Sequence, residues 1–236
     1  MTELHRNTLV WLTPKAWTTV HAQNWEAPVQ DLLRYWQTCQ FPWVVAHQRP
    51  GVTPGEVCLG LPAPQHWGRR RLGTQVALDG IARQGQFPML SEVAGSHLWG
   101  IPAASWLTRG VGLCAQVRVY GSYGWQHMTG LPYVRAGSDL DLSVQVSDLP
   151  TAMRALDWLA QAGETPDTGH AAFQRLPMRV DGEIVFPHGQ AVAWRELQTM
   201  RQGGVRQVLV KDRFRLRLVD AEGLKAMVAA PAAAMV

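Results

Sequence analysis

The sequence predicts an α+β protein in which a smaller N-terminal α/β domain precedes a domain with a mixed sheet and flanking helices. The chain has 236 residues, enough for one large or two small domains. Its 47% hydrophobic and 17% charged residues are typical of a globular chain with a substantial core. Strand-like runs alternate irregularly with helical segments, which favours a mixed architecture. We place the boundary near residues 85–95 and assign residues 1–90 to the first domain and 91–236 to the second.

The composition indicates which kinds of partner and which cellular compartment to expect. The net charge of +4 and the pI near 9.2 indicate a mild preference for anionic partners, short of a nucleic-acid-binding signature. The chain has no apolar run of 18 residues, and its first residues lack the features of a secretory signal. The three cysteines are scattered and include no CxxC pair, as expected of free thiols in a reducing compartment. We therefore expect a cytoplasmic protein that binds neither nucleic acid nor a membrane.

The first domain is expected to contain short strands and one amphipathic helix. The strand-like runs are residues 41–50, 56–62 and 69–78. The segment NWEAPVQDLLRYWQTCQ has helical periodicity, with Asn24 as a candidate N-cap. Its apolar face is formed by Val29, Leu32, Leu33 and Trp36.

The second domain is expected to alternate strands with helices. Residues 88–110 predict two short helices divided near Gly100 and Pro102, and Ser147 or Asp148 is expected to cap a helix near 150–162. A helical turn is expected in QAVAWRELQTM, and a last helix near the C-terminus. The strand-like runs of this half are 115–122, 138–146, 173–180, 181–187 and 207–219.

One strand of the second domain, SDLDLSVQV, carries two acids within an otherwise apolar run. Residues two apart share a face of a strand, so Asp139 and Asp141 lie on the polar face with Ser143 and Gln145. Paired carboxylates bind hard divalent cations, whereas burial without a cation raises one pKa or destabilises the strand. The alternative is an amphipathic strand with a solvated polar face, which a bare DxD motif does not exclude.

A Gly-Ser pair upstream of the acids favours the metal site. Gly121 ends a β-branched run, where a missing side chain lets a backbone N–H approach a phosphate closely. Ser122 adds a hydroxyl donor at the expected N-terminus of the next helix, a position that favours anions. A phosphate cradle beside a paired-aspartate strand is typical of metal-dependent nucleotidyl transfer.

This arrangement resembles the nucleotidyltransferase superfamily of DNA polymerase β, in which Gly-Ser is followed by Asp-x-Asp on the next strand. Here 16 residues separate Ser122 from Asp139, a few more than is usual. The segment GSYGWQHMTGLPYVRAGSDLDL is similar, almost position by position, to the signature of malonate decarboxylase holo-acyl-carrier-protein synthases, which are phosphoribosyl-dephospho-CoA transferases. The matching positions are Gly121, Ser122, Trp125, Gln126, Thr129, Gly130, Leu131, Tyr133 and Ser138 to Leu142. Flanking segments such as HRNTLVWL extend the resemblance over most of the chain.

The resemblance implies a nucleotidyltransferase-like catalytic domain and a reaction. Enzymes of this family transfer phosphoribosyl-dephospho-CoA from 2′-(5″-triphosphoribosyl)-3′-dephospho-CoA to a serine of the apo acyl carrier subunit of malonate decarboxylase, releasing diphosphate. The implied cofactor is Mg²⁺ or Mn²⁺, and the implied catalytic and metal-binding pair is Asp139 and Asp141. A third carboxylate is expected from a neighbouring strand.

The remaining site residues are weaker predictions. Asp181 is the candidate third carboxylate, although Asp-Gly between two strand-like runs is also a hairpin-turn signal, and Glu183 is the alternative. Lys211 is a candidate for stabilising the leaving diphosphate. Trp125 is expected to pack in the core rather than to stack on a base.

Two groups of arginines are candidates for contact with an acidic carrier protein or the triphosphate. One is Arg69–Arg71, and the other is Arg213, Arg215 and Arg217, which alternate and would share one face of a strand. An arginine run is more often a solvated face. Two other functions stay open, namely a metal-dependent nucleotidyltransferase for another protein or small-molecule hydroxyl, and a non-catalytic nucleotide-binding module.

Overall fold

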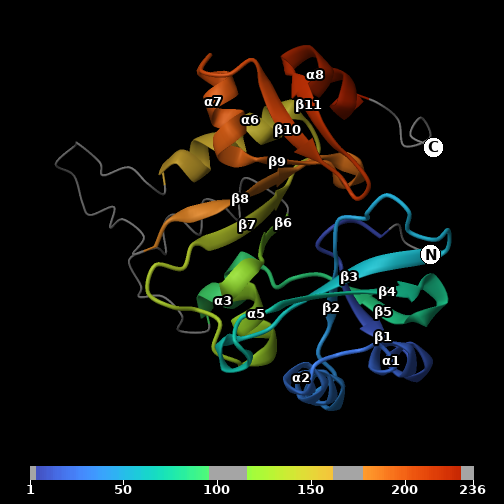
Figure 1. Ribbon diagram of the computed structural model, residues 1–236. Helices are drawn as coiled ribbons and strands as arrows, with labels where there is room; N and C mark the ends of the chain where they lie inside the picture. The colour runs from blue at the N-terminus through green and yellow to red at the C-terminus, as the bar shows by residue number, and fades with distance from the viewer. Residues whose placement is uncertain (1–3, 96–115, 162–177, 230–236) are drawn as a thin grey trace.

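The computed structural model describes residues 4–95, 116–161 and 178–229. These residues form two β-sheets with flanking helices (Figure 1). The first sheet has the strand order β4-β3-β2-β1-β5 and is antiparallel throughout. Its strands are β1 (Leu9–Leu12), β2 (Trp43–Val45), β3 (Glu56–Pro62), β4 (Arg71–Ala77) and β5 (Ile81–Gly85). The second sheet has the order β11-β10-β9-β8-β7-β6. Its strands are β6 (Gln116–Val119), β7 (Leu140–Gln145), β8 (Val180–Val185), β9 (Ala191–Ala193), β10 (Gln207–Lys211) and β11 (Leu216–Asp220).

The helices lie mainly on the outer sides of the two sheets. They are α1 (Pro14–His21), α2 (Ala27–Thr38), α3 (Leu90–Gly95), α5 (Gly121–Thr129), α6 (Leu149–Gln161), α7 (Trp194–Arg201) and α8 (Ala221–Ala229), with short 3-10 turns η1 (Gln65–Trp67), η2 (Leu78–Gly80) and η4 (Pro187–Gly189). Figure 1 shows α1 and α2 at one end of the molecule and α6, α7 and α8 at the other. The β7–β8 pair is parallel and the other pairs of the second sheet are antiparallel, so the predicted α+β class with a mixed sheet is confirmed. No helix within the described ranges has both the length and the apolar character needed to cross a membrane.

The first sheet buries its core against α1 and α2. The four predicted apolar residues of α2 are all buried, which confirms the helical periodicity. The predicted cap at Asn24 is wrong, because the helix begins at Ala27 with Glu26 in the N-cap position and no side-chain cap. Pro28 lies in the first helical turn, where its missing N–H leaves nothing unsatisfied and its fixed φ suits the helix.

The second sheet follows the alternation of the SDLDLSVQV segment. Leu140, Leu142 and Val144 are fully buried and belong to the same apolar cluster as the inward face of α6. Asp148 rather than Ser147 caps α6, since its Oδ1 accepts a hydrogen bond of 2.7 Å from the Thr151 backbone N–H. The polar face of β7 is therefore turned away from α6.

Three expectations from the sequence either differ from the structure or concern residues that are only partly described. The hairpin turn at Asp181-Gly182 is absent, because β8 runs through both residues parallel to β7. The predicted strand 207–219 is two antiparallel strands, β10 and β11, joined by a turn in which Asp212 Oδ1 accepts from the backbone N–H groups of Phe214 and Arg215. The helices expected over 88–110 are represented by α3, and residues 96–115, like most of the predicted strand 173–180, lie outside the described residues.

The signature helix α5 connects the two sheets. Trp125 is buried in the core of the first sheet, with its ring centroid 6.0 Å from that of Trp36 and 5.4 Å from that of Phe87. Gln126 Oε1 accepts hydrogen bonds from the backbone N–H groups of Tyr133 (3.1 Å) and Val134 (2.9 Å). These contacts confirm Trp125 as a packing residue and give Gln126 a structural role, that of holding the loop after α5.

Tyr133 extends this connection, and its hydroxyl provides a test. Tyr133 Oη donates a hydrogen bond of 2.7 Å to the carbonyl of Pro62 at the end of β3. We expect Tyr133→Phe to lower the free energy of unfolding by about 1 kcal/mol, because the carbonyl loses a partner in a partly buried site. Denaturant unfolding measures this, with Tyr35→Phe on the exposed side of α2 as the control. Unchanged stability would show that the hydrogen bond does not hold the two sheets together.

Candidate active site

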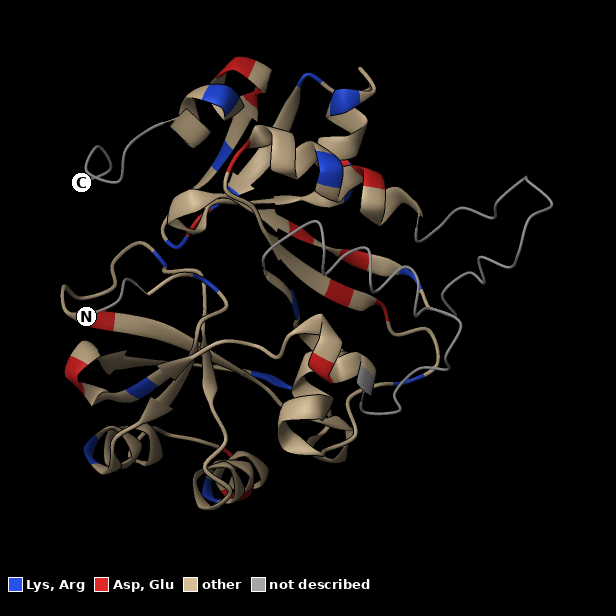
Figure 2. Ribbon diagram, turned by 180° about the vertical axis from the view of Figure 1, so that it is seen from behind, with Lys and Arg blue, Asp and Glu red and all other residues tan. Residues whose placement is uncertain are grey.

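The polar faces of β7 and β8 bring the predicted carboxylates together. The two strands are parallel, with Asp141 opposite Asp181 and Ser143 opposite Glu183. Opposite residues project from the same face of a sheet on strands about 4.8 Å apart. Asp139 lies just before β7 on the same side as Asp141. Acidic residues accordingly lie next to each other on neighbouring strands of the second sheet (Figure 2).

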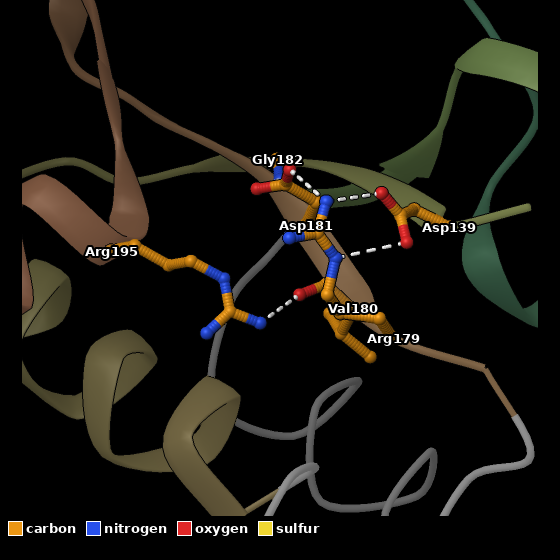
Figure 3. A network of polar contacts seen from close by, with 6 residues as sticks. All are labelled: Asp139, Arg179, Val180, Asp181, Gly182 and Arg195. Atoms are coloured by element: carbon orange, nitrogen blue, oxygen red, sulfur yellow. Dashed lines mark hydrogen bonds and ion pairs between the residues drawn. The ribbon is translucent and has the colours of Figure 1, made fainter. Parts of the chain in front are cut away.

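Arg179 contacts two of these carboxylates (Figure 3). Its Nε donates to Asp139 Oδ1 at 2.9 Å, its Nη2 pairs with Asp139 Oδ2, and Nη2 lies 3.4 Å from Asp181 Oδ2. This fork-like hydrogen bond from Arg179 lowers the pKa of Asp139 below its ordinary value. Our sequence prediction missed Arg179, although its position two residues before Asp181 on the same strand face was a usable signal.

Asp141 lies deeper than Asp139 and has a different electrostatic environment. Burial, followed by the nearby charges of Asp181 and Asp139, raises the pKa of Asp141 to about 6. The three carboxylates carry three formal negative charges, against the guanidinium of Arg179, which contacts them, and the more distant charge of Arg195. The cluster therefore favours an additional cation.

Gly121 brings the start of α5 against the carboxylate of Asp141. Its φ is +60°, and a Cβ added there would lie 1.8 Å from Asp141 Oδ2. The preceding backbone N–H, that of Tyr120, donates a hydrogen bond of 3.0 Å to the carbonyl of Asp141. Ser122 follows in the first turn of α5 and is partly exposed. The predicted phosphate cradle and the predicted metal strand are thus in direct contact.

Glu183 follows Asp181 by two residues on the same face of β8, and Lys211 on β10 contacts it. Lys211 Nζ is 3.4 Å from Glu183 Oε1, and the guanidinium of Arg6 forms an ion pair with Glu183 Oε2. The Glu183 side chain is 8% exposed, so a buried carboxylate is held between two cations. Of the two candidates for the third carboxylate, the register favours Asp181, because it stands opposite Asp141 and Glu183 stands opposite Ser143.

The donor set suits a hard divalent cation, although the side chains do not converge into a ligand sphere here. Asp139, Asp141 and Asp181 supply only carboxylate oxygens, the ligands that Mg²⁺ and Mn²⁺ prefer. Within the described ranges, no three His, Cys, Asp or Glu side chains are arranged to hold a metal ion. Asp139 and Asp181 contact Arg179 instead, so the chemistry of the site fits a cation and its present geometry is that of an arginine-paired cluster.

The two predicted arginine groups have other contacts. Arg70 pairs with Glu26 next to α2, and Arg71 begins the edge strand β4 of the first sheet. Arg213 and Arg215 lie in the β10–β11 turn, and Arg217 lies in β11. The prediction that Arg213, Arg215 and Arg217 share one strand face is therefore wrong. The alternating spacing is interrupted by the Asp212 turn, which the sequence pattern did not reveal.

Replacing Arg179 tests its contact with Asp139. In the metal-free protein, Arg179→Gln should raise the pKa of Asp139, because the mutation removes the positively charged hydrogen-bond donor. The stability that this pair contributes is present at neutral pH and is lost as the pH falls through the pKa of Asp139 in the folded state. Carboxyl-carbon NMR titration measures the change, with Arg34→Gln on α2 as the matched control. Identical titration of Asp139 in all three proteins would contradict the pairing.

Comparisons with known proteins match both parts of the chain. The N-terminal domain model of the phosphoribosyl-dephospho-CoA transferase MdcG matches residues 5–87, and its C-terminal domain model matches residues 101–222. A phosphoribosyl-dephospho-CoA transferase of Xanthomonas campestris pv. campestris is 35% identical over 222 residues, covering 93% of this chain and 95% of the relative. Another, of Bradyrhizobium diazoefficiens, is 33% identical over 220 residues, covering 91% and 89%. No solved structure matches. With its two matched domains and these relatives, the chain belongs to the phosphoribosyl-dephospho-CoA transferase family of enzymes.

Proposed function

We propose that this enzyme transfers phosphoribosyl-dephospho-CoA from 2′-(5″-triphosphoribosyl)-3′-dephospho-CoA to a serine of the apo acyl carrier subunit of malonate decarboxylase, releasing diphosphate. The observation that carries the proposal is the contact between the Gly121 turn and the cluster of Asp139, Asp141 and Asp181. This contact places an anion-favouring helix start beside carboxylates suited to a divalent cation. The relatives named phosphoribosyl-dephospho-CoA transferase support the identity of the group transferred.

In the proposed reaction, one group of residues binds the phosphates and another holds the metal ion. The serine oxygen forms a bond to the α-phosphorus while the bond to the bridging oxygen of the diphosphate breaks, and the serine proton is released. Backbone N–H groups at the start of α5 and the Ser122 hydroxyl would donate to the phosphate oxygens. Asp139, Asp141 and Asp181 would hold Mg²⁺ or Mn²⁺, which stabilises charge on attacking and leaving oxygens when bound. Lys211 forms an ion pair with Glu183, which follows Asp181 by two residues on the same face of β8. To contact the leaving diphosphate, Lys211 would have to turn away from Glu183.

Intact mass spectrometry of the carrier tests this function. Incubation of the enzyme with apo carrier, the triphosphate precursor and Mg²⁺ should add one phosphoribosyl-dephospho-CoA mass to the carrier and release an equal amount of diphosphate. A carrier whose acceptor serine is replaced by alanine should stay unmodified. Absence of the added mass, or its presence on the alanine carrier, would overturn the proposal.

Arg215 is the best arginine for testing recognition of an acidic carrier. Arg213 is unsuitable, because its guanidinium stacks on Phe214 at 4.8 Å and donates to the carbonyl of Leu4, so its loss would disturb the contact between the two sheets. Arg215 is exposed at the same turn. We expect Arg215→Glu to lower the association rate with the carrier by about three- to tenfold at low salt and to flatten its salt dependence.

The control for this test is Arg34→Glu, a reversal of an exposed charge on α2. Transfer rates are measured against ionic strength for both variants and the original protein, together with the affinity for the triphosphate precursor. If the two variants show the same salt dependence as the original protein, the β10–β11 turn does not contact the carrier.

A further inference from the structure

A cavity with both polar and apolar lining lies between the two sheets, next to the candidate active site. Its volume is about 310 Å³, at the lower end of the range of small-molecule sites. One wall contains Arg118, Ser143 and Glu183, which lie in a single row across β6, β7 and β8. Residues 5–8, the HRNT motif that precedes β1, form part of the facing wall. The cavity is therefore built by both parts of the chain.

The cavity continues the polar face that carries the acids. Ser143 follows Asp141 by two residues on the same face of β7, a separation of about 7 Å. Tyr120, which also lines the cavity, immediately precedes Gly121. A ligand whose reacting phosphate lies at the acids would thus reach the cavity within the length of one sugar ring.

The polar groups of the wall combine donors with a carboxylate. The Nε nitrogens of Arg6 and Arg118 are buried and have no hydrogen-bond partner among the described residues. Both guanidinium groups nevertheless belong to residues that line the cavity, where they add positive charge to its walls. Glu183, held by Arg6 and Lys211, presents an acceptor in the same wall. This mixture suits hydroxyl groups, which donate and accept, better than a phosphate, which the carboxylate would repel.

We propose that this cavity binds the ribosyl-nucleoside part of the substrate, an inference that rests on the function proposed above. Two substituents extend from the reacting phosphorus, the leaving diphosphate and the ribose that carries the nucleoside. The start of α5 provides backbone donors for the diphosphate. The cavity, with its carboxylate and its hydroxyl at Ser143, receives the ribosyl side. Arg6, Ser143 and Glu183 are then residues that determine which nucleotide is accepted.

Calorimetry with two probes tests this assignment. The first probe is 2′-(5″-phosphoribosyl)-3′-dephospho-CoA, which lacks the leaving diphosphate and does not react, and the second is inorganic diphosphate, both with Mg²⁺. Ser143→Val removes the hydroxyl and presents methyl groups to the cavity instead, on a side chain that suits a strand. It should raise the Kd of the first probe at least tenfold and that of diphosphate less than twofold. Gln145→Leu, further along the same wall, should act in the same direction, and Ser147→Val, beyond the cavity on an exposed position, should change neither.

Three other binding results would contradict the inference. If the original protein binds the first probe and both cavity variants bind it equally well, the cavity inference is overturned and the proposed function stands. If the variants weaken diphosphate instead, the cavity holds the leaving group and the inference is again wrong. If the original protein binds neither probe, the proposed function fails together with the inference. Thermal unfolding of each variant shows whether a loss of binding comes from a loss of folding.

Discussion

Asp141→Asn should reduce transfer to the carrier by about three orders of magnitude or more while leaving the protein folded. The mutation removes a carboxylate from the centre of the acidic cluster, where it faces Asp181 across the sheet. It also removes a buried charge that Asp181 and Asp139 repel. Without metal, the free energy of unfolding at neutral pH should therefore be unchanged or slightly higher than in the original protein.

Asp139→Asn distinguishes the effect of a cluster carboxylate on the transfer rate from its effect on stability. Its loss of activity should be similarly large, but its stability should not rise, because Asp139 is the ion-pair partner of Arg179. Asp157→Asn on α6, which breaks an exposed pair with Arg201, is the matched control and should transfer at the original rate. Single-turnover transfer and denaturant unfolding measure the two effects. If Asp141→Asn retains activity within tenfold of the original, this carboxylate is not part of the reaction.

Gly121→Ala is expected to lose at least about a hundredfold in transfer rate. The added Cβ would lie 1.8 Å from Asp141 Oδ2, so the carboxylate or the start of α5 must move. The φ of +60° adds a strain of about 1–2 kcal/mol for any residue with a Cβ. Both the position of Asp141 and the backbone donors of α5 should be disturbed.

Gly130→Ala is a matched control at the other end of the same helix. Gly130 has a φ of +70°, and a Cβ there would meet nothing within 4 Å. The control should lose a similar 1–2 kcal/mol of stability, roughly, from strain and keep its transfer rate. The difference in rate between the two variants measures the contact with Asp141. Equal rates would show that Gly121 serves only as a turn.

The sequence correctly predicted buried faces where a hydrophobic pattern repeats within one strand or helix. The alternation of β7 predicted which face is buried, and the helical spacing of α2 predicted its four buried residues. The Gly-Ser pair and the two acids were predicted to be neighbours, and the structure places Gly121 against Asp141. These features depend on local periodicity and on a motif whose parts follow each other along the chain.

The remaining features depend on contacts between distant segments. The ion pair of Arg6 with Glu183 joins residues 177 positions apart, and no local pattern indicates it. The pairing of Asp181 with Asp141 depends on the register of a parallel strand pair, which a sequence pattern leaves open between Asp181 and Glu183. The arginines near 213–217 were misplaced because Asp212 forms a turn inside what reads as a continuous strand.

We propose that the acidic cluster acts through a bound divalent cation, and removal of the metal tests this role. The rate of transfer to the carrier is measured by intact mass in chelator-treated buffer and then across a titration with Mg²⁺. We expect no transfer in the chelator and a saturable recovery of the full rate with Mg²⁺. Transfer at the full rate in the presence of the chelator would show that the cluster does not act through a metal ion.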